Sequence, residues 1–285
     1  MLKMRNTQKP VHIAKQQNKS PKSSAADQLE IIYFTDPLCC WSWAMEPQLR
    51  KIQYEYNGQI KWRYCMGGML PGWNNYHDEI NSVSRPLQMG PVWMHAQYVS
   101  GMPMDANIWM KDAPASSYPA CIAFKNASMQ SREAGARYLR LLREAVMIRG
   151  ENISKKNALL AIADRLSDEK KYNFNSSIFR QQLKEENALE AFRNDLQEVQ
   201  TQQVKRFPTF ILKRNQQGII LTGYRPYENI HEALLQVSPG IEKNNSAIDA
   251  AEYEAYWGFM TDKEKEATRS IWKKEQSRLY STKEG

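Results

Sequence analysis

The order of strand-like and helix-like segments constrains the fold of this chain more than any other feature. A strand-length apolar run at 29–34 stops at Pro37, and a helical pattern follows from about 41 to 56. Alternating apolar and polar residues at 60–66 then predict a second strand. Strand, helix and strand in close succession are typical of a βαβ unit, so we expect these two strands to be parallel. Pro47 should kink or split the helix between them.

A long helical block separates this unit from the rest of the predicted sheet. Residues 72–200 have apolar positions at helical spacing, and we expect their acidic side chains to face solvent. Strand patterns return at 208–212 and 219–221 around a polar turn, which predicts a hairpin. Pro226 suits the first turn of a following helix. The tryptophans of the block should serve as core and loop anchors: Trp73, Trp93 and Trp109.

These patterns predict an α/β fold whose sheet is interrupted by a helical insertion. We expect a disordered basic leader at 1–28, a sheet domain made of 29–71 and 201–240, and an inserted helical domain at 72–200. A helical extension should occupy 241–285. In that extension Thr261 and Glu264 fit a capping box, and the chain beyond them could pack down through Ile271 and Trp272.

The basic net charge of +8 belongs largely to the leader. The chain has 39 basic and 31 acidic residues, and six of the basic ones lie within 1–26, which leaves 33 against 31. Without a basic cluster on the body we expect no nucleic-acid partner. No apolar run approaches about 20 residues, so we expect no membrane span. The leader lacks the apolar region of a signal peptide, which predicts a cytoplasmic protein with reduced cysteines.

Cys39 is the main candidate for chemistry, because it lies directly after the first predicted strand and before the first helix. The N–H groups of a helix N-terminus stabilise a thiolate, so we expect a lowered pKa for this thiol. Trp41 and Trp43 would provide an apolar substrate-binding surface beside it. The alternative is that Cys39 is a small buried core residue.

The segment 36–47, Asp-Pro-Leu-Cys-Cys-Trp-Ser-Trp-Ala-Met-Glu-Pro, resembles the active-site segment of DsbA-like proteins of the FrnE type. It is also similar to the DsbA-related protease adaptors of the ClpXP–Spx system in Gram-positive bacteria. Phe207-Pro208-Thr209-Phe210 resembles the cis-proline loop of these families. The resemblance implies a thioredoxin-like fold with a large helical insertion over roughly 29–237. It also implies that Phe207, Pro208 and Thr209 bind substrate opposite Cys39.

The chain departs from the family pattern at Ser42, where a Cys-x-x-Cys motif has its second cysteine. An alcohol cannot resolve a mixed disulfide, because exchange requires a thiolate. Monothiol exchange through Cys39 remains, with Ser42 hydrogen-bonded to the thiolate and glutathione or a substrate thiol completing the cycle. Cys40 is a candidate resolving residue through a strained vicinal disulfide. Cys65 and Cys121 are interpreted as core residues, although Cys65 could approach the site.

Two interpretations follow. In the first, which we place slightly ahead, the chain is a thiol–disulfide oxidoreductase of the DsbA family that uses Cys39. In the second, it is a non-redox adaptor that binds a protein client for a Clp-type protease in the groove beside Cys39. We expect neither a bound cofactor nor a metal ion. The four histidines have no zinc-ligand spacing, and the sequence contains no glycine-rich phosphate loop.

Overall fold

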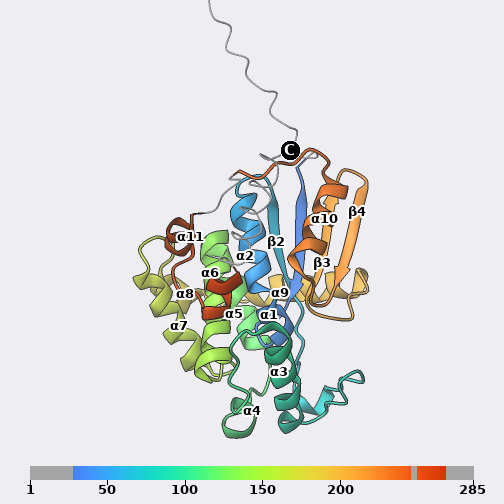
Figure 1. Ribbon diagram of the computed structural model, residues 1–285. Helices are drawn as coiled ribbons and strands as arrows, with labels where there is room; N and C mark the ends of the chain where they lie inside the picture. The colour runs from blue at the N-terminus through green and yellow to red at the C-terminus, as the bar shows by residue number, and fades with distance from the viewer. Residues whose placement is uncertain (1–27, 245–248, 268–285) are drawn as a thin grey trace, which may run out of the picture.

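A four-stranded mixed sheet forms the centre of the molecule, seen in a computed structural model that describes residues 28–244 and 249–267 (Figure 1). The strand order is β2-β1-β3-β4. Strands β1 and β2 are parallel, as the βαβ pattern predicts, whereas β3 is antiparallel to both β1 and β4. The strands are β1 (Glu30–Thr35), β2 (Lys61–Met66), β3 (Thr209–Arg214) and β4 (Gln217–Thr222).

Two short helices follow β1 in place of one continuous helix. They are α1 (Cys40–Ala44) and α2 (Glu46–Glu55), and Pro47 lies in the first turn of α2. The proline splits the helix because it has no N–H to donate to the preceding turn. Helix α2 and α10 (Tyr227–Val237) pack on one face of the sheet through a shared apolar core. Residues at the end of α9 (Asn187–Thr201) pack against β1 and β3 on the other side.

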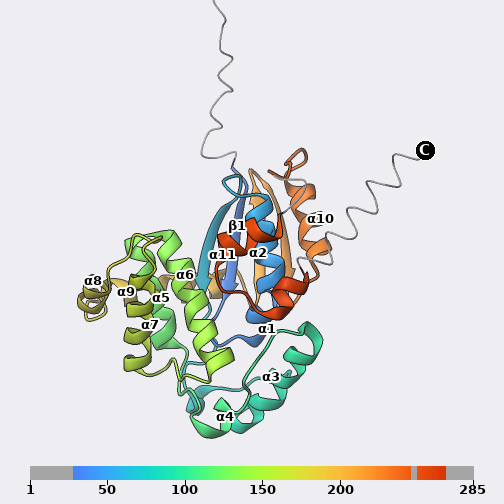
Figure 2. The ribbon, with the colours of Figure 1, turned by 60° about the vertical axis from the view of Figure 1, so that its left-hand side comes forward.

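The inserted helices form a second lobe beside β2 and below α1 (Figure 2). Trp93 and Trp109 are buried in its core, with perpendicular rings 5.2 Å apart, and the half-buried Trp73 contacts Trp109 edge-on. The tryptophans therefore have the core role that the sequence predicts. The elements of this lobe are η2 (Trp73–Asn75), α3 (Pro86–Ser100), α4 (Ile108–Lys111), α5 (Tyr118–Gln130), α6 (Arg132–Arg143), the π-helical turn η3 (Glu144–Ile148), α7 (Lys156–Asp168) and α8 (Ser176–Gln182).

A buried ionic network joins the lobe to the sheet domain. Arg143 of α6 pairs with Glu46 of α2, and Arg140 pairs with both Glu46 and Glu144. Glu144 and Asp195 are each at most 5% exposed, so the prediction of solvated acids in the helical block is wrong for them. Each carboxylate has a cationic partner that compensates for the lost hydration. Arg140 pairs with Glu144, and Lys125 donates to Asp195.

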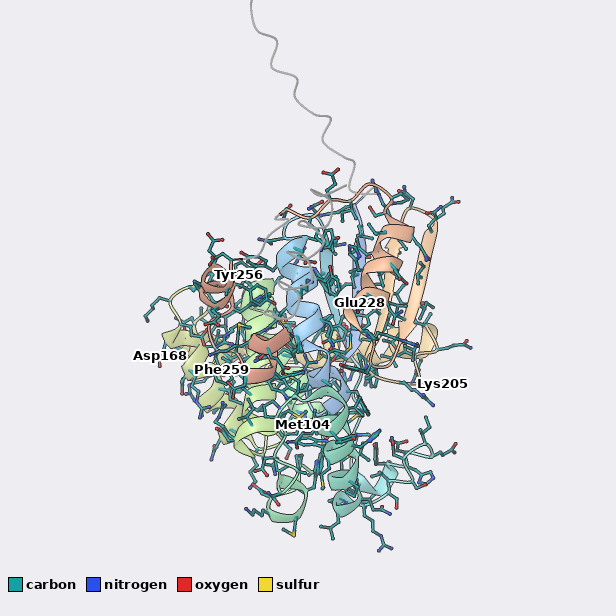
Figure 3. The ribbon with its side chains drawn as sticks, in the orientation of Figure 1. Met104, Asp168, Lys205, Glu228, Tyr256 and Phe259 are labelled. Carbon is teal, nitrogen blue, oxygen red and sulfur yellow. The ribbon has the colours of Figure 1, made fainter. Side chains whose placement is uncertain are left out.

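The C-terminal segment returns to this junction. Helix α11 (Ala250–Trp257) is followed by a turn and by a further helix that begins at 262. Thr261 and Glu264 form the predicted capping box, and Glu264 also binds Arg50 and Arg140. Figure 3 shows Tyr256 and Phe259 on the side where this segment crosses the inserted helices. The leader at 1–27 and the predicted packing of Ile271 and Trp272 lie outside the described residues.

The architecture is a thioredoxin-like fold with a large helical insertion. None of the helices within residues 28–244 and 249–267 is both long enough and apolar enough to cross a bilayer.

Candidate functional site

The turn between β1 and α1 fixes the position of Cys39. The Asp36 carboxylate accepts a hydrogen bond from the Leu38 N–H at 2.8 Å, and the Cys39 N–H donates to the Asp36 carbonyl at 3.1 Å. Cys39 is the N-cap of α1, and its Sγ accepts from the Ser42 N–H at 3.3 Å. The Asp-Pro-Leu-Cys segment therefore folds into a turn that places the thiol at the start of the helix, as predicted.

A second segment brings a backbone carbonyl to this thiol. The Phe207–Pro208 peptide bond is cis, the isomer that the resemblance implies. The Cys39 Sγ–H donates to the Phe207 carbonyl oxygen at 3.4 Å. The two segments meet because β3 pairs with β1, with Thr209 opposite Phe34. Lys205, in the loop that leads to the proline, points outward from the molecule (Figure 3).

The protonation state of Cys39 differs from the prediction. Cys39 is only 3% exposed. Burial raises the pKa of the Cys39 thiol, and the interactions with Ser42 lower it by less. Helix α1 has only five residues, so it provides few aligned peptide dipoles. The expected lowered pKa is wrong, and the geometry favours a neutral thiol that donates to Phe207.

Ser42 interacts with Cys39 through both its backbone and its side chain. Its N–H donates to the Cys39 Sγ at 3.3 Å, and its side chain also lowers the pKa of the Cys39 thiol, by less than burial raises it. The predicted interaction of the serine side chain with the sulfur is therefore accompanied by one from the main chain. The serine still fills the position of a resolving cysteine, and no thiol occupies it.

Two predicted substrate-binding residues are buried in the fold. Trp43 is 0% exposed, its indole N–H donates to the Pro103 carbonyl, and Arg140 stacks on its ring. Thr209 is 2% exposed, and its hydroxyl donates to the Arg206 carbonyl. Both side chains are used in packing and in the cis-proline turn, and their substrate-binding role stays a prediction.

Trp41 and Phe207 remain at the edge of the site. Trp41 is half-buried between His95 of α3 and Tyr224, which precedes α10. The half-buried Phe207 ring lies over Gly67, where an added Cβ would come within 2.1 Å of the ring. The site therefore has an aromatic wall on the insertion side and a second one formed by the cis-proline loop.

The other cysteines lie in the interior. Cys40 is buried in the core that α1 shares with the insertion, and burial raises its pKa well above the ordinary value. Cys65 donates to the Asp195 carbonyl at 3.4 Å and packs behind β1. Cys121 donates to the Asp36 carboxylate at 3.5 Å. All four cysteines are free thiols, so the proposed resolving role of Cys40 stays a prediction.

Sequence reasoning missed two buried charged groups behind the site. Asp36 accepts from the Met69 N–H and from the Ser117 hydroxyl, and burial raises its pKa. Arg143 donates to Thr35 at the end of β1 and pairs with Glu46. Asp36 belongs to the quoted motif and could have been suspected. Arg143 lies in the amphipathic helix α6, where nothing in the sequence marks it.

Cys65, Asp195 and Glu198 have potential metal-ligand atoms within 4.8 Å of one another. Lys125 binds both carboxylate oxygens of Asp195 at 2.8 Å, and Arg63 binds Glu198 through two nitrogens. These cations neutralise the carboxylates, so the cluster is complete as an ion-pair network and does not suit a metal ion.

The chain is similar in sequence to known proteins. Residues 33–232 match the Thioredoxin family. The chain is 34% identical over 209 residues to the ClpXP adapter protein SpxH of Halalkalibacterium halodurans, covering 72% of this chain and 66% of that one. It is 28% identical over 241 residues to the Bacillus subtilis SpxH, covering 83% and 76%.

Solved structures agree with the fold. A putative protein disulfide isomerase from Nitrosomonas europaea has a TM-score of 0.60 at 21% identity, covering 74% of this chain and 96% of that one. The cytosolic disulfide reductase DsbM from Pseudomonas aeruginosa has a TM-score of 0.57 at 19% identity, covering 73% and 100%.

Proposed function

The chain belongs to the DsbA-like thioredoxin-fold family, and from this premise we propose that it is an adaptor that holds a protein client for a Clp-type protease. The sequence relatives described above are ClpXP adapter proteins, which supports this assignment. The matched region spans about two thirds of the first relative. As such an adaptor the chain would act in the cytoplasm.

The state of Cys39 is the observation that carries the proposal. Its thiol is buried, its pKa is raised, and Ser42 stands where a resolving thiol would be. A protonated thiol is a poor nucleophile, and a mixed disulfide formed there would have no neighbouring thiol to release it. The cis-proline loop and the half-buried Trp41 are nevertheless retained, which suits a surface that binds a client without reacting with it.

Monothiol exchange is the second candidate, favoured by the position of Cys39 at the start of α1, where the Ser42 N–H donates to its Sγ. The Cys39 thiol would give up its proton, and the thiolate would attack a substrate disulfide. A mixed disulfide would form and one substrate thiolate would leave. A glutathione thiolate would then attack the substrate sulfur of that bond. This second exchange would regenerate the Cys39 thiolate and leave the substrate joined to glutathione.

A degradation assay tests the adaptor proposal. Purified ClpXP and the Spx regulator are incubated with and without the chain, and the half-life of Spx is measured. We expect the chain to shorten that half-life, and Cys39→Ala to do so equally well. If degradation is not accelerated, the adaptor proposal is wrong.

Exchange with oxidised glutathione tests the second candidate. Ser42→Cys restores Cys-x-x-Cys and serves as the positive control. If the wild-type protein reacts faster than a free thiol and Cys39→Ala does not, monothiol exchange is supported. A rate no higher than that of a free thiol rules it out.

A further inference from the structure

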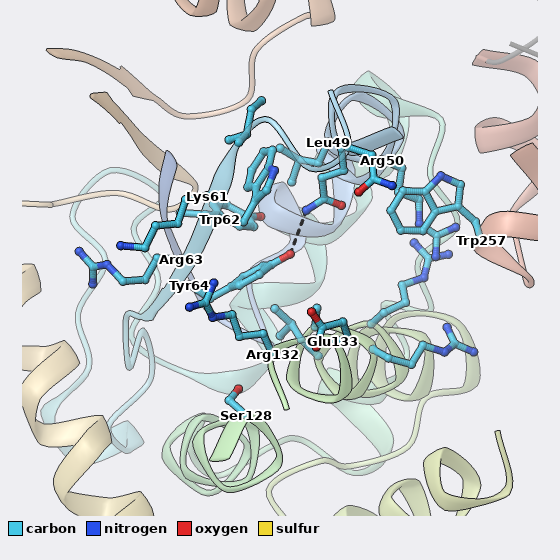
Figure 4. Close-up of a pocket in the computed structure, with 18 of the residues that line it drawn as sticks. Leu49, Arg50, Lys61, Trp62, Arg63, Tyr64, Ser128, Arg132, Glu133 and Trp257 are labelled. Carbon is cyan, nitrogen blue, oxygen red and sulfur yellow. Dashed lines mark hydrogen bonds between the residues drawn. The ribbon is translucent and has the colours of Figure 1, made fainter. Parts of the chain in front are cut away.

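A cleft of about 1000 Å³ lies along the outer edge of the sheet, between β2 and helices α5 and α6. Figure 4 shows the strand on one side, with Arg132 and Glu133 across from it and Trp257 at one end. Arg143, which lies behind the Cys39 site, also lines the cleft, but Cys39, Ser42 and Phe207 do not.

One wall of the cleft is a sheet edge. The Lys61 N–H donates to the Leu29 carbonyl at 2.9 Å, which fixes the alternation along the parallel pair. Lys61, Arg63 and Cys65 therefore turn their backbone groups toward β1, and the residues between them turn theirs outward. The outward N–H of Met66 is bound by Asp195 at 2.8 Å.

The remaining outward groups belong to Trp62 and Tyr64, which line the cleft. Within the described ranges no hydrogen bond is recorded for their N–H groups. An open strand edge of this kind is a template for pairing with another extended chain. The two aromatic side chains lie beside it, and the Tyr64 hydroxyl accepts from Gln53 at 3.0 Å.

The charged side chains that line the cleft indicate which kind of extended peptide it would bind. Nine Lys and Arg side chains line the cleft, against Glu46 and Glu133. Most of these cations are neutralised by carboxylate partners, such as Glu198 for Arg63 and Asp195 for Lys125. Arg132 and Lys171 are exposed, and neither has an ion pair among the described residues. These two side chains make the accessible part of the lining complementary to acidic groups.

We propose that this cleft binds an extended, acidic segment of a partner protein, which adds as a strand beside β2 at Trp62 and Tyr64. Backbone hydrogen bonds to the open edge give the affinity, and carboxylates that approach the exposed Arg132 and Lys171 select the sequence. The site lies apart from the client groove of the proposed function and does not depend on it.

A fluorescent peptide of alternating valine and glutamate is the probe, measured by fluorescence polarisation with the full chain. We expect it to bind, and the matched valine–lysine peptide to bind much more weakly. Arg132→Glu should weaken binding by about five- to tenfold. Lys156→Glu, an exposed change on α7 outside the cleft, should leave binding unchanged.

Amide hydrogen exchange locates the peptide. Pairing with the open edge should slow exchange at Trp62 and Tyr64, whereas the Arg63 amide already faces β1 and should change little. The proposal is overturned if no binding occurs up to about 1 mM peptide. Equal binding of the lysine peptide, or protection at the cis-proline loop in place of β2, would also overturn it. Degradation of Spx is a separate readout, so failure here leaves the adaptor proposal standing.

Discussion

The thiol of Cys39 donates a hydrogen bond to the backbone carbonyl of Phe207, 168 residues later in the chain, at 3.4 Å. A thiolate could not donate this bond, and its charge would face the negative end of the carbonyl dipole. The contact therefore acts together with burial to keep the sulfur protonated. It also ties the start of α1 to the cis-proline loop, so the chemical state of the thiol and the shape of the groove are linked.

The first prediction concerns the titration of Cys39. Its pKa is raised by burial, so alkylation by iodoacetamide should increase only above the ordinary thiol range near 8.5. The folded state binds this proton more tightly than the unfolded state. The resulting stability is present below the unfolded pKa and is lost as pH rises through the folded pKa. Peptide mapping by mass spectrometry follows Cys39, with the urea-unfolded protein as control; a folded pKa at or below that of the control contradicts the prediction.

The second prediction concerns Arg143, which is 1% exposed. Arg143→Met should destabilise the protein by about 3–5 kcal/mol, because it leaves the buried Glu46 carboxylate without one of its cations. Urea unfolding at neutral pH measures the change. Arg149→Met, which removes a partly exposed pair with Glu151, should stay within about 0.5 kcal/mol. If the two substitutions lower the free energy of unfolding equally, the buried pair contributes no more to stability than the partly exposed one.

The third prediction concerns acid stability. Burial alone would raise the pKa of Glu264, but Arg140 and Arg50 outweigh it and hold that pKa below its usual range. Because the folded pKa is lowered, the stabilisation is present above the unfolded value near 4.3 and is lost as pH falls through the folded pKa.

Glu264→Gln should therefore lower the free energy of unfolding at pH 7 by about 3 kcal/mol and reduce its fall in acid. Urea unfolding at neutral and acid pH tests this. Glu266→Gln, which alters an exposed ion pair, is the matched control. A wild-type acid dependence that survives unchanged in Glu264→Gln would argue against this role.

The fourth prediction concerns the packing of the cis-proline loop. Gly67→Ala would place a Cβ 2.1 Å from the Phe207 ring, so the ring must move. We expect a loss of about 1–3 kcal/mol in stability and weaker client capture, because the displaced ring belongs to the groove. Thermal unfolding and Spx degradation measure the two effects. Gly90→Ala in α3 meets no atom closer than 3.9 Å and should be neutral or slightly stabilising; client capture that survives in Gly67→Ala would remove Phe207 from the binding surface.

Much of the fold could be predicted from local patterns. The alternation at 60–66 and the apolar run at 29–34 predict two strands, and both form within one residue of those limits. Pro47 splits the helix because the missing N–H acts within a single turn. The position of Cys39 at a helix start follows from the Asp-Pro break beside it. These are short-range effects, in which the cause lies a few residues from the consequence.

The tertiary structure alone decided the environment of the site. Whether Cys39 is a thiolate depends on its burial, and its Sγ contacts a carbonyl 168 residues later in the chain. Trp43 is a residue type that is common on binding surfaces, but here its ring is covered by Arg140 from the inserted lobe. Burial, the pairing of buried charges and the exposure of a sheet edge all depend on residues that are far apart in the sequence. For that reason the sequence determined the elements and the candidate nucleophile, whereas the packing decided the protonation state and which surfaces stay open.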